Sequence, residues 1–208
     1  MKSKSDLKIT LKKIWHFIWD DNSIWSWIVN IILAFVLIKF IVYPVLSLLL
    51  GTTHPVVAVV SSSMEHNQEF SKWWEHNQEW YLNNGITNGE FLTYPMKNGF
   101  RRGDIIVLLG KQPKDIKRGD IIVFRTGGRE PIIHRIVQIT TDENGFIYST
   151  KGDNNAGQIK RPLVDETKIN EAQVIGTAFF RIPVLGYVKI LSVEIVCNGY
   201  KFGFCPDM

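Results

Sequence analysis

The sequence predicts a mainly antiparallel β-sheet domain that follows a single N-terminal membrane-spanning helix. The helix is predicted because residues 24–51 are almost wholly apolar. The sheet is predicted because short β-branched runs and turn residues alternate after this segment, whereas helical periodicity is rare. A near-repeat supports it, since Arg-Gly-Asp-Ile-Ile-Val occurs at 102–107 and again at 118–123. The expected domains are therefore a basic N-terminus at 1–23, the helix at 24–51 and the β domain at 52–208.

The apolar segment is long enough to cross a bilayer, because a helix needs about 20 apolar residues for a hydrocarbon core of about 30 Å. A cleaved signal peptide is the competing interpretation, but its apolar core would hold only about 7–15 residues. This segment has 28 residues, and no small-x-small cleavage site follows it cleanly. Lys39 is its only full charge. We expect that side chain to extend toward the outer headgroups, with Pro44 breaking or kinking the helix.

Basic charge is concentrated at the membrane end of the chain. Residues 1–23 carry five lysines against three aspartates, whereas residues 52–208 carry 18 basic and 17 acidic side chains. Flanks rich in lysine and arginine stay in the cytoplasm, which predicts a cytoplasmic N-terminus and an external domain. The near-balanced charge of the domain leaves no basic stripe, so nucleic-acid binding is excluded. The predicted location is the cell membrane, or the endoplasmic reticulum membrane in a eukaryote, with a single span.

Within the domain, each copy of the near-repeat reads as a Gly-Asp turn that leads into a buried strand. Other β-branched or alternating runs predict four more strands, bounded by turn residues. These runs lie at 56–60, 132–139, 145–150 and 174–181.

Residues 65–100 form an aromatic and polar insertion in which the tetrapeptide His-Asn-Gln-Glu occurs twice. Its histidines and glutamates could bind a metal, but their spacing fixes no coordination geometry. We therefore expect a polar segment that packs on the domain or rests on the membrane, with no metal and no other cofactor. Its tryptophans are expected to be packing or interfacial anchors rather than a substrate cage. The residues concerned are His66, Glu69, Trp73, Trp74, His76, Glu79 and Trp80.

The two cysteines, Cys197 and Cys205, lie near the end of the sequence. In an oxidising compartment they could close a small loop through a disulfide, and two unpaired thiols are the equal alternative. A catalytic cysteine is not expected, because the last seventy residues contain no histidine.

Three short segments carry residue types that suit nucleophilic catalysis. Residues 60–64 run from a strand into three serines and a methionine, His134 lies within an apolar strand, and Asp153 lies in a tight turn. A serine nucleophile needs a base that accepts its proton, and that base needs an orienting group. Spacing alone does not bring the three together, since most turn serines and strand histidines are structural.

In order and context these segments resemble the type I signal peptidases, of the archaeal and endoplasmic-reticulum branch. The serine–methionine pair at 63–64 matches the family's nucleophile motif, and Ile-His-Arg-Ile at 133–136 matches the motif of its base. Lys-Gly-Asp-Asn-Asn at 151–155 matches its final motif. The resemblance covers most of the chain and implies a β-sheet catalytic domain of the signal peptidase I type. The catalytic residues that it implies are Ser63, His134 and Asp153.

Two departures from the rest of the family refine this assignment. Bacterial and organellar members have lysine at the base position, so His134 indicates the other branch. Many relatives have a second aspartate six residues after the first, but Ile159 stands there in this chain. The acid that supports the histidine is therefore expected to be Asp153, with a later acid such as Asp165 as the alternative.

The resemblance also implies an oxyanion hole and a function. The oxyanion is expected to be stabilised by the Ser63 amide and the Ser61 hydroxyl. The implied function is a membrane-bound serine endopeptidase that removes signal peptides from translocated preproteins, after Ala-x-Ala-like sites. Its expected partners are these preproteins and the lipid bilayer, close to the protein translocation channel. The alternative is a catalytically inactive, membrane-tethered β domain that serves as a subunit or scaffold of a secretion complex.

Overall fold

A computed structural model describes residues 4–128, 130–143 and 145–183, with side chains from residue 8 onward in those ranges. The two cysteines lie outside the described residues, and so does the question of their pairing. The chain divides into an N-terminal and a C-terminal unit, and the boundary in the sequence lies between residues 49 and 50.

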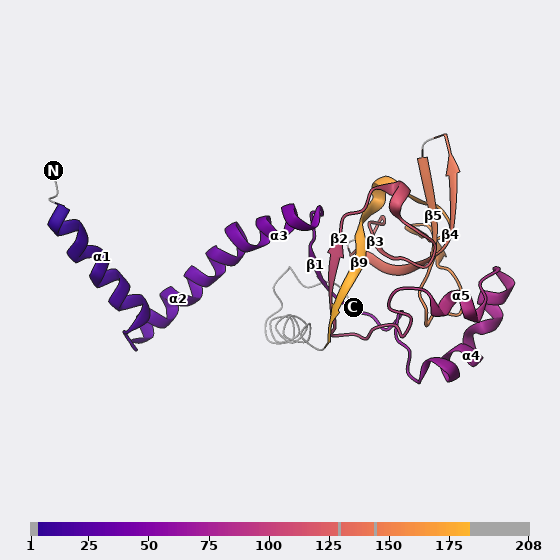
Figure 1. The fold of residues 1–208 in the computed structure, drawn as a ribbon, viewed down its shortest axis with the longest axis horizontal. Coiled ribbons are helices and arrows are strands. Elements are labelled where there is room, and N and C mark those ends of the chain that lie inside the picture. Colours follow the sequence, from indigo (N-terminus) through magenta and orange to yellow (C-terminus); the bar gives the residue numbers. More distant parts are fainter. Residues whose placement is uncertain (1–3, 129, 144, 184–208) are drawn as a thin grey trace. The chain divides into compact units, whose positions relative to one another are not determined.

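The N-terminal unit begins with two helices that meet at a hydrogen-bonded corner. Helix α1 spans Lys4–Trp19 and helix α2 spans Ile24–Leu37 (Figure 1). Ser23 caps α2 by accepting a hydrogen bond from the backbone N–H of Ser26. The hydroxyl of Ser26 and the side-chain amide of Asn30 donate to carbonyl groups in the last turn of α1, at 2.6 and 2.9 Å. The basic N-terminus is therefore helical, a feature that its charge pattern alone does not predict.

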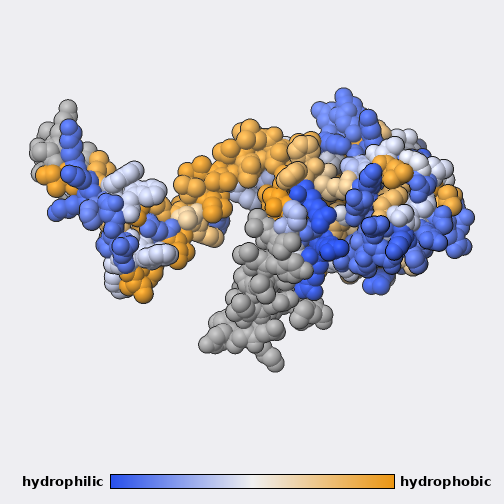
Figure 2. Space-filling view, turned by 60° about the horizontal axis from the view of Figure 1, so that its bottom comes forward, coloured by the Kyte–Doolittle hydropathy of each residue, from blue (hydrophilic) through white to orange (hydrophobic). Residues whose placement is uncertain are grey.

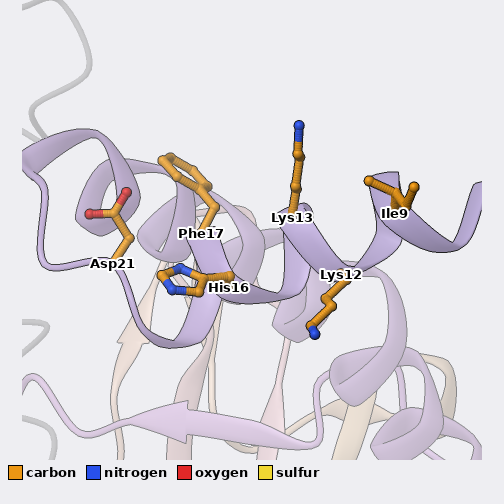
Figure 3. Close-up of a pocket in the computed structure, with 6 residues that line it drawn as sticks. All are labelled: Ile9, Lys12, Lys13, His16, Phe17 and Asp21. Atoms are coloured by element: carbon orange, nitrogen blue, oxygen red, sulfur yellow. The ribbon is translucent and has the colours of Figure 1, made fainter. Parts of the chain in front are cut away.

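A hollow of about 500 Å³ lies along α1 and the turn that follows it. In Figure 3, Lys12 and Lys13 point to opposite sides of α1. The lining contains no serine or cysteine, so it offers no nucleophile of the predicted kind. The lining residues are Ile9, Lys12, Lys13, His16, Phe17 and Asp21.

A continuous helical segment from Ile24 to Leu50 follows the corner. It consists of α2, a π-helical turn at Ile38–Val42, and helix α3 at Tyr43–Leu50. Within the described residues, it is the one helix long and apolar enough to cross a membrane, with a mean hydropathy of 2.5. Figure 2 shows hydrophobic residues covering the visible face of this helix. The predicted N-terminal helix that could span a membrane is thus present.

Pro44 does not break this helix, in contrast to the stronger form of the expectation. Proline lacks a backbone N–H, and its ring clashes with the carbonyl four residues earlier. The preceding turn is widened, and the N–H of Tyr43 donates to the carbonyl of Ile38 rather than to a residue four positions back. A π turn of this kind accommodates an irregularity without ending the helix. The ammonium group of Lys39 lies over the rings of Phe35 and Phe40, 5.7 and 5.5 Å from their centroids.

The C-terminal unit is built on a seven-stranded antiparallel sheet with the strand order β1-β2-β9-β3-β4-β5-β8 (Figure 1). The mainly antiparallel β fold predicted from the sequence is therefore confirmed. The strands of this sheet are β1 Val56–Ala58, β2 Ile105–Leu109, β3 Ile121–Phe124, β4 Ile132–Asp142, β5 Gly145–Lys151, β8 Ile169–Asn170 and β9 Val174–Ile182.

Short elements connect the longer strands. Strands β6 at Lys160–Arg161 and β7 at Val164–Asp165 form a separate two-stranded ladder between β5 and β8 in the chain. Two 3-10 turns lie at Pro113–Asp115 and Glu171–Gln173. Glu166, the residue after β7, is hydrogen-bonded to Thr150 of the main sheet.

The two copies of the near-repeat form the same turn and lead into two strands that flank β9. Gly103 and Gly119 have φ angles of 89° and 92°, values that glycine adopts without strain. The carboxylates of Asp104 and Asp120 each accept a hydrogen bond from the backbone N–H three residues earlier, at 2.8 and 3.1 Å. The predicted pattern of a Gly-Asp turn followed by a buried strand is therefore correct at both places.

The insertion at 65–100 contains two helices that the sequence analysis did not predict, α4 at Phe70–Asn83 and α5 at Asn88–Leu92 (Figure 1). Their aromatic residues form a buried cluster that includes Val137 of β4, so the insertion packs on the sheet. Trp73 and Trp74 are therefore packing residues. The other buried members of the cluster are Tyr81, Ile86, Phe91 and Tyr94.

Candidate active site

Ser63 lies in a turn that follows the edge strand β1. The turn is closed by the backbone N–H of Glu65, which donates to the carbonyl of Ser62 at 3.0 Å. Met64 is 1% exposed and packs in the core beneath the turn, so the adjacent Ser63 is held half-buried at its surface. The hydroxyl oxygens of Ser61 and Ser63 lie 3.1 Å apart. The first predicted segment thus presents two neighbouring hydroxyl groups.

Strand β4 positions His134, opposite Ile122 of β3. The His134 side chain is 3% exposed, and the next residue, Arg135, is fully buried. Successive strand residues point to opposite faces of a sheet. The insertion covers the face on which Arg135 lies, as the contacts of Arg135 with the rings of Phe91 and Tyr94 show. His134 is buried on the other face, beside Glu166.

Gly152, in the turn after β5, lies beside both Ser63 and His134. A Cβ atom at this position would lie 2.7 Å from Nε2 of His134 and 2.9 Å from the carbonyl oxygen of Ser63. The same turn is bonded to the serine segment, because the backbone N–H of Asn154 donates to the Ser63 carbonyl at 2.8 Å. The Asn154 side chain also donates to the carbonyl of Ser62, at 3.2 Å. The Ser63 carbonyl and Nε2 of His134 therefore both lie beside Gly152.

Asp153 lies next in this turn, but its carboxylate faces other partners than His134. One oxygen accepts hydrogen bonds from Nε of Arg135 at 2.9 Å and from the hydroxyl of Tyr81 at 3.2 Å. The other oxygen contacts Arg135 Nη2 at 2.7 Å and Nε2 of His66 at 3.1 Å. A carboxylate offers about four acceptor positions. All four are occupied, so Asp153 connects β4 to the insertion.

The acid beside His134 is Glu166, which follows β7. Its Oε1 atom is hydrogen-bonded to Nδ1 of His134 and accepts a second bond from the hydroxyl of Thr150 at 3.0 Å. Its Oε2 atom accepts a bond from the backbone N–H of Ile159 at 2.6 Å. Glu166 is fully buried, whereas the adjacent Asp165 is exposed and bonds to Thr167.

No family model matches the chain. The signal peptidase complex catalytic subunit SEC11 of Lachancea thermotolerans is 38% identical over 109 residues, which cover 50% of this chain and 64% of the relative. SEC11 of Yarrowia lipolytica is 32% identical over 123 residues, or 54% of this chain and 65% of the relative. The chain is a homologue of signal peptidase catalytic subunits. The Homo sapiens subunit SEC11C is 36% identical over 104 residues, or 48% of this chain and 54% of the relative. The matches thus cover less than two thirds of each of these relatives.

The three residues selected from the sequence occupy one region, in which Gly152 lies beside both Ser63 and His134. Asp153 lies next to Gly152 in the chain, but its carboxylate pairs with Arg135 and His66. Sequence reasoning missed Glu166, although it named the adjacent Asp165 as an alternative acid. The segment Val164-Asp165-Glu166 contains no motif that indicates which of its two acids is buried.

His66 is buried, in agreement with the expectation that the insertion packs on the domain. It belongs to the first His-Asn-Gln-Glu copy, yet its ring stacks on Trp73 at 3.7 Å between centroids and its Nε2 contacts Asp153. The second copy's His76 is exposed and bonds to the carbonyl of Lys72. In the described part of the chain, no group of three or more histidine, cysteine or acidic side chains gathers as metal ligands would.

The electrostatics of the site follow from burial and from Arg135. Burial alone would raise the pKa of Asp153, but the charge of Arg135 and the hydrogen bonds from His66 and Arg135 hold that pKa well below its usual range. Burial, the Asp153 charge and the hydrogen bond to Asp153 raise the pKa of Tyr81 well above its usual value. Asp153 is therefore a charged carboxylate at neutral pH, and Tyr81 is a neutral donor to it.

Lys151 is buried against the insertion. Its ammonium group lies 5.1 Å from the ring centroid of Trp80 and 4.7 Å from that of Tyr81, and it donates to the carbonyl groups of Gly152 and Asp153. Burial lowers the pKa of Lys151 to about 8, although Asp153 and Glu166 oppose the shift. The Lys151 ammonium group thus holds the turn at Gly152 and Asp153, although burying its charge is unfavourable.

We predict that this lysine makes stability rise with pH. Between pH 8 and about 9.5 the unfolded chain keeps the Lys151 proton while the folded chain loses it, so the free energy of unfolding rises, by up to about 1.4 kcal/mol per pH unit. Urea unfolding of the whole chain in detergent, followed by tryptophan fluorescence, measures this slope. In Lys151→Met the slope should be smaller by this contribution, and equal slopes in the two proteins would contradict the assignment.

Proposed function

We propose that this protein is a serine endopeptidase that removes signal peptides from translocated preproteins, cutting after small-x-small sites. The observation that carries the proposal is that the Ser63 carbonyl oxygen and Nε2 of His134 both lie beside Gly152, 2.9 and 2.7 Å from the position that a Cβ atom would take there. The printed names of the homologues, catalytic subunits of a signal peptidase complex, support the same reaction. No observation favours the inactive scaffold, and the segments that carry the proposed nucleophile and base lie beside the same glycine.

In the proposed mechanism, His134 acts as the general base. Its Nδ1 atom faces a carboxylate, which can only accept, so Nδ1 carries the ring proton and Nε2 has a free lone pair. Nε2 removes the proton of Ser63 as the serine oxygen attacks the scissile carbonyl. The protonated His134 then delivers this proton to the leaving amine, and a water molecule hydrolyses the acyl-enzyme by the same route. The reaction requires no cofactor.

The oxyanion hole in this proposal consists of the Ser63 amide and the Ser61 hydroxyl. Donors that are already in place stabilise the charge on the tetrahedral intermediate without reorganisation. The 3.1 Å separation of the two serine hydroxyls supports this role, because it places the Ser61 group beside the attacking atom. Asp153 contributes through its neighbours, since its bonds to Arg135 and His66 fix the turn that carries Gly152.

The substrate is proposed to bind as an added strand beside β1. This strand lies at an edge of the sheet, and Ser63 follows shortly after its end. An extended peptide that pairs with a sheet edge gains main-chain hydrogen bonds, while alternate side chains enter pockets. Val60, between the strand and the serines, is 56% exposed and is available for such contact.

The proposed location is a membrane, with the N-terminus cytoplasmic and the β domain on the outer or lumenal side. The helix at 24–50 and the lysine-rich segment before it support this orientation. Signal peptides emerge at that side beside the protein translocation channel, so a tethered domain would meet its substrates and the bilayer together. Protease added outside sealed membranes should remove residues after the helix, and complete protection would contradict the orientation.

The test of the proposed reaction is cleavage of a preprotein by the whole chain in phospholipid vesicles. We expect one cut, after an Ala-x-Ala site, identified by the N-terminus of the product. A matched preprotein with large residues in place of both alanines should remain uncut, because the proposed specificity requires small side chains at both positions. Failure to cut the first preprotein, or equal cutting of both, would refute the proposed specificity.

A further inference from the structure

We propose that Glu166 is the positioning acid of the catalytic histidine, in place of Asp153, and that it substitutes for the aspartate missing at position 159. The inference rests on the proposed function, because it assigns a role within the same site. It concerns the third member of the catalytic set, which neither the motifs nor the homologues' names identify.

The first argument is the set of bonds that Glu166 makes. Its carboxylate is fully buried and faces Nδ1 of His134 on one oxygen, with the Thr150 hydroxyl on the same oxygen. The backbone N–H of Ile159 holds the other oxygen at 2.6 Å. A carboxylate fixed by three donors can hold the imidazole in one tautomer and orientation, and it stabilises the imidazolium that forms during the reaction.

The second argument is the position of the Glu166 backbone. Its carbonyl accepts from the N–H of Thr150 at 2.8 Å, and its own N–H donates to the carbonyl of Ile159 at 3.0 Å. Glu166 is therefore hydrogen-bonded on one side to the end of β5, which leads to the catalytic turn, and on the other to residue 159. In the family that the sequence resembles, many members have an aspartate at the position of Ile159. Here a carboxylate arrives at the backbone of that same position from the β6–β7 ladder.

The third argument is that Asp153 has no capacity left for His134. Both of its oxygens are occupied by Arg135, and each accepts one further bond, from Tyr81 or His66. The paired guanidinium neutralises its charge within the buried network. Asp153 thus serves the packing of the insertion on the sheet, while Glu166 serves the imidazole.

The kinetic experiment compares Glu166→Gln with Asp165→Asn, a substitution of the exposed neighbouring acid. We expect Glu166→Gln to lower kcat by about 10²–10⁴-fold with KM changed by less than about threefold, because the lost charge acts on the transition state. Asp165→Asn should leave both constants unchanged. Ser63→Ala is measured beside them: a chain that needs Ser63 but keeps its kcat in Glu166→Gln would overturn this inference and leave the proposed function intact.

A second measurement uses the unaltered chain, so it does not depend on the folding of a variant with a changed buried charge. Nitrogen-15 NMR of the histidine-labelled whole chain in detergent reports which ring nitrogen of His134 carries the proton. We expect a protonated Nδ1 and an unprotonated Nε2 at neutral pH, and the opposite tautomer would overturn the inference. The His134 signal is assigned by its loss in His134→Gln.

Discussion

Replacement of Ser63 by alanine is expected to lower kcat/KM for preprotein cleavage by at least about 10³-fold. Alanine retains the backbone of the turn and removes only the atom that attacks the scissile carbonyl. Any remaining rate would come from binding and oxyanion stabilisation, which act without the nucleophile. The measurement is the initial rate of product formation by the whole chain in detergent, at preprotein concentrations below KM.

Ser62→Ala is the matched control for this variant. Ser62 belongs to the same run of serines and is exposed, and its described contacts run through its backbone carbonyl, which the substitution keeps. Its kcat/KM should stay within about threefold of the unaltered chain, as is usual for exposed positions without a functional contact. Ser61→Ala tests the oxyanion proposal separately, with an expected loss of about 10²–10³-fold in kcat. Equal rates for Ser63→Ala and Ser62→Ala would exclude Ser63 as the nucleophile.

The parts of the fold that could be predicted from the sequence are those governed by local patterns. The Gly-Asp turns were recognisable because glycine permits the positive φ that these turns require, and the strands after them are β-branched. Helix α4 was missed, although the residues that it turns toward the core follow a helical spacing. Trp73, Trp74 and Tyr81 are buried and lie three, four and eleven positions after the half-buried Phe70. Its polar and aromatic composition concealed that period.

The parts of the site that could not be predicted depend on contacts between distant segments. Ser63 and His134 stand in recognisable motifs, but Glu166 reaches His134 from 32 residues further along the chain. In a short strand pair, one step along the backbone separates a buried side chain from an exposed one. The sequence analysis therefore reached the right neighbourhood with Asp165 and could not determine which of the two adjacent acids faces inward.

Arg135 is the residue whose loss should destabilise the fold most. It lies in the His-Arg pair of β4, and all five of its N–H donors are used. Two bond to Asp153, two to the carbonyls of Pro95 and Met96, and one to the carbonyl of Gly119. The guanidinium group of Arg135 is fully buried and therefore connects the sheet, the turn that contains Asp153 and the insertion.

Arg135→Met is expected to lower the free energy of unfolding by about 3–5 kcal/mol at pH 7, because it leaves the charge of Asp153 buried without a partner. Arg118→Met, which removes a partly exposed arginine paired with Glu90, should cost at most about 1 kcal/mol. The double variant Arg135→Met with Asp153→Asn should recover part of the loss, since it removes the unpaired charge as well. Urea unfolding of the whole chain in detergent measures all three.

The pH dependence of the Arg135→Met deficit provides an independent check. In the unaltered chain the lowered pKa of Asp153 stabilises the fold above the ordinary carboxyl pKa of about 4, and this contribution is lost as pH falls through the folded value. Without Arg135, burial raises the pKa of Asp153 instead, so the folded variant binds a proton more readily than the unfolded chain. The deficit should therefore be largest near pH 7 and shrink toward pH 4. A deficit that stays constant with pH would show that Arg135 acts through packing of its aliphatic stem and carbonyl contacts, and not through the charge of Asp153.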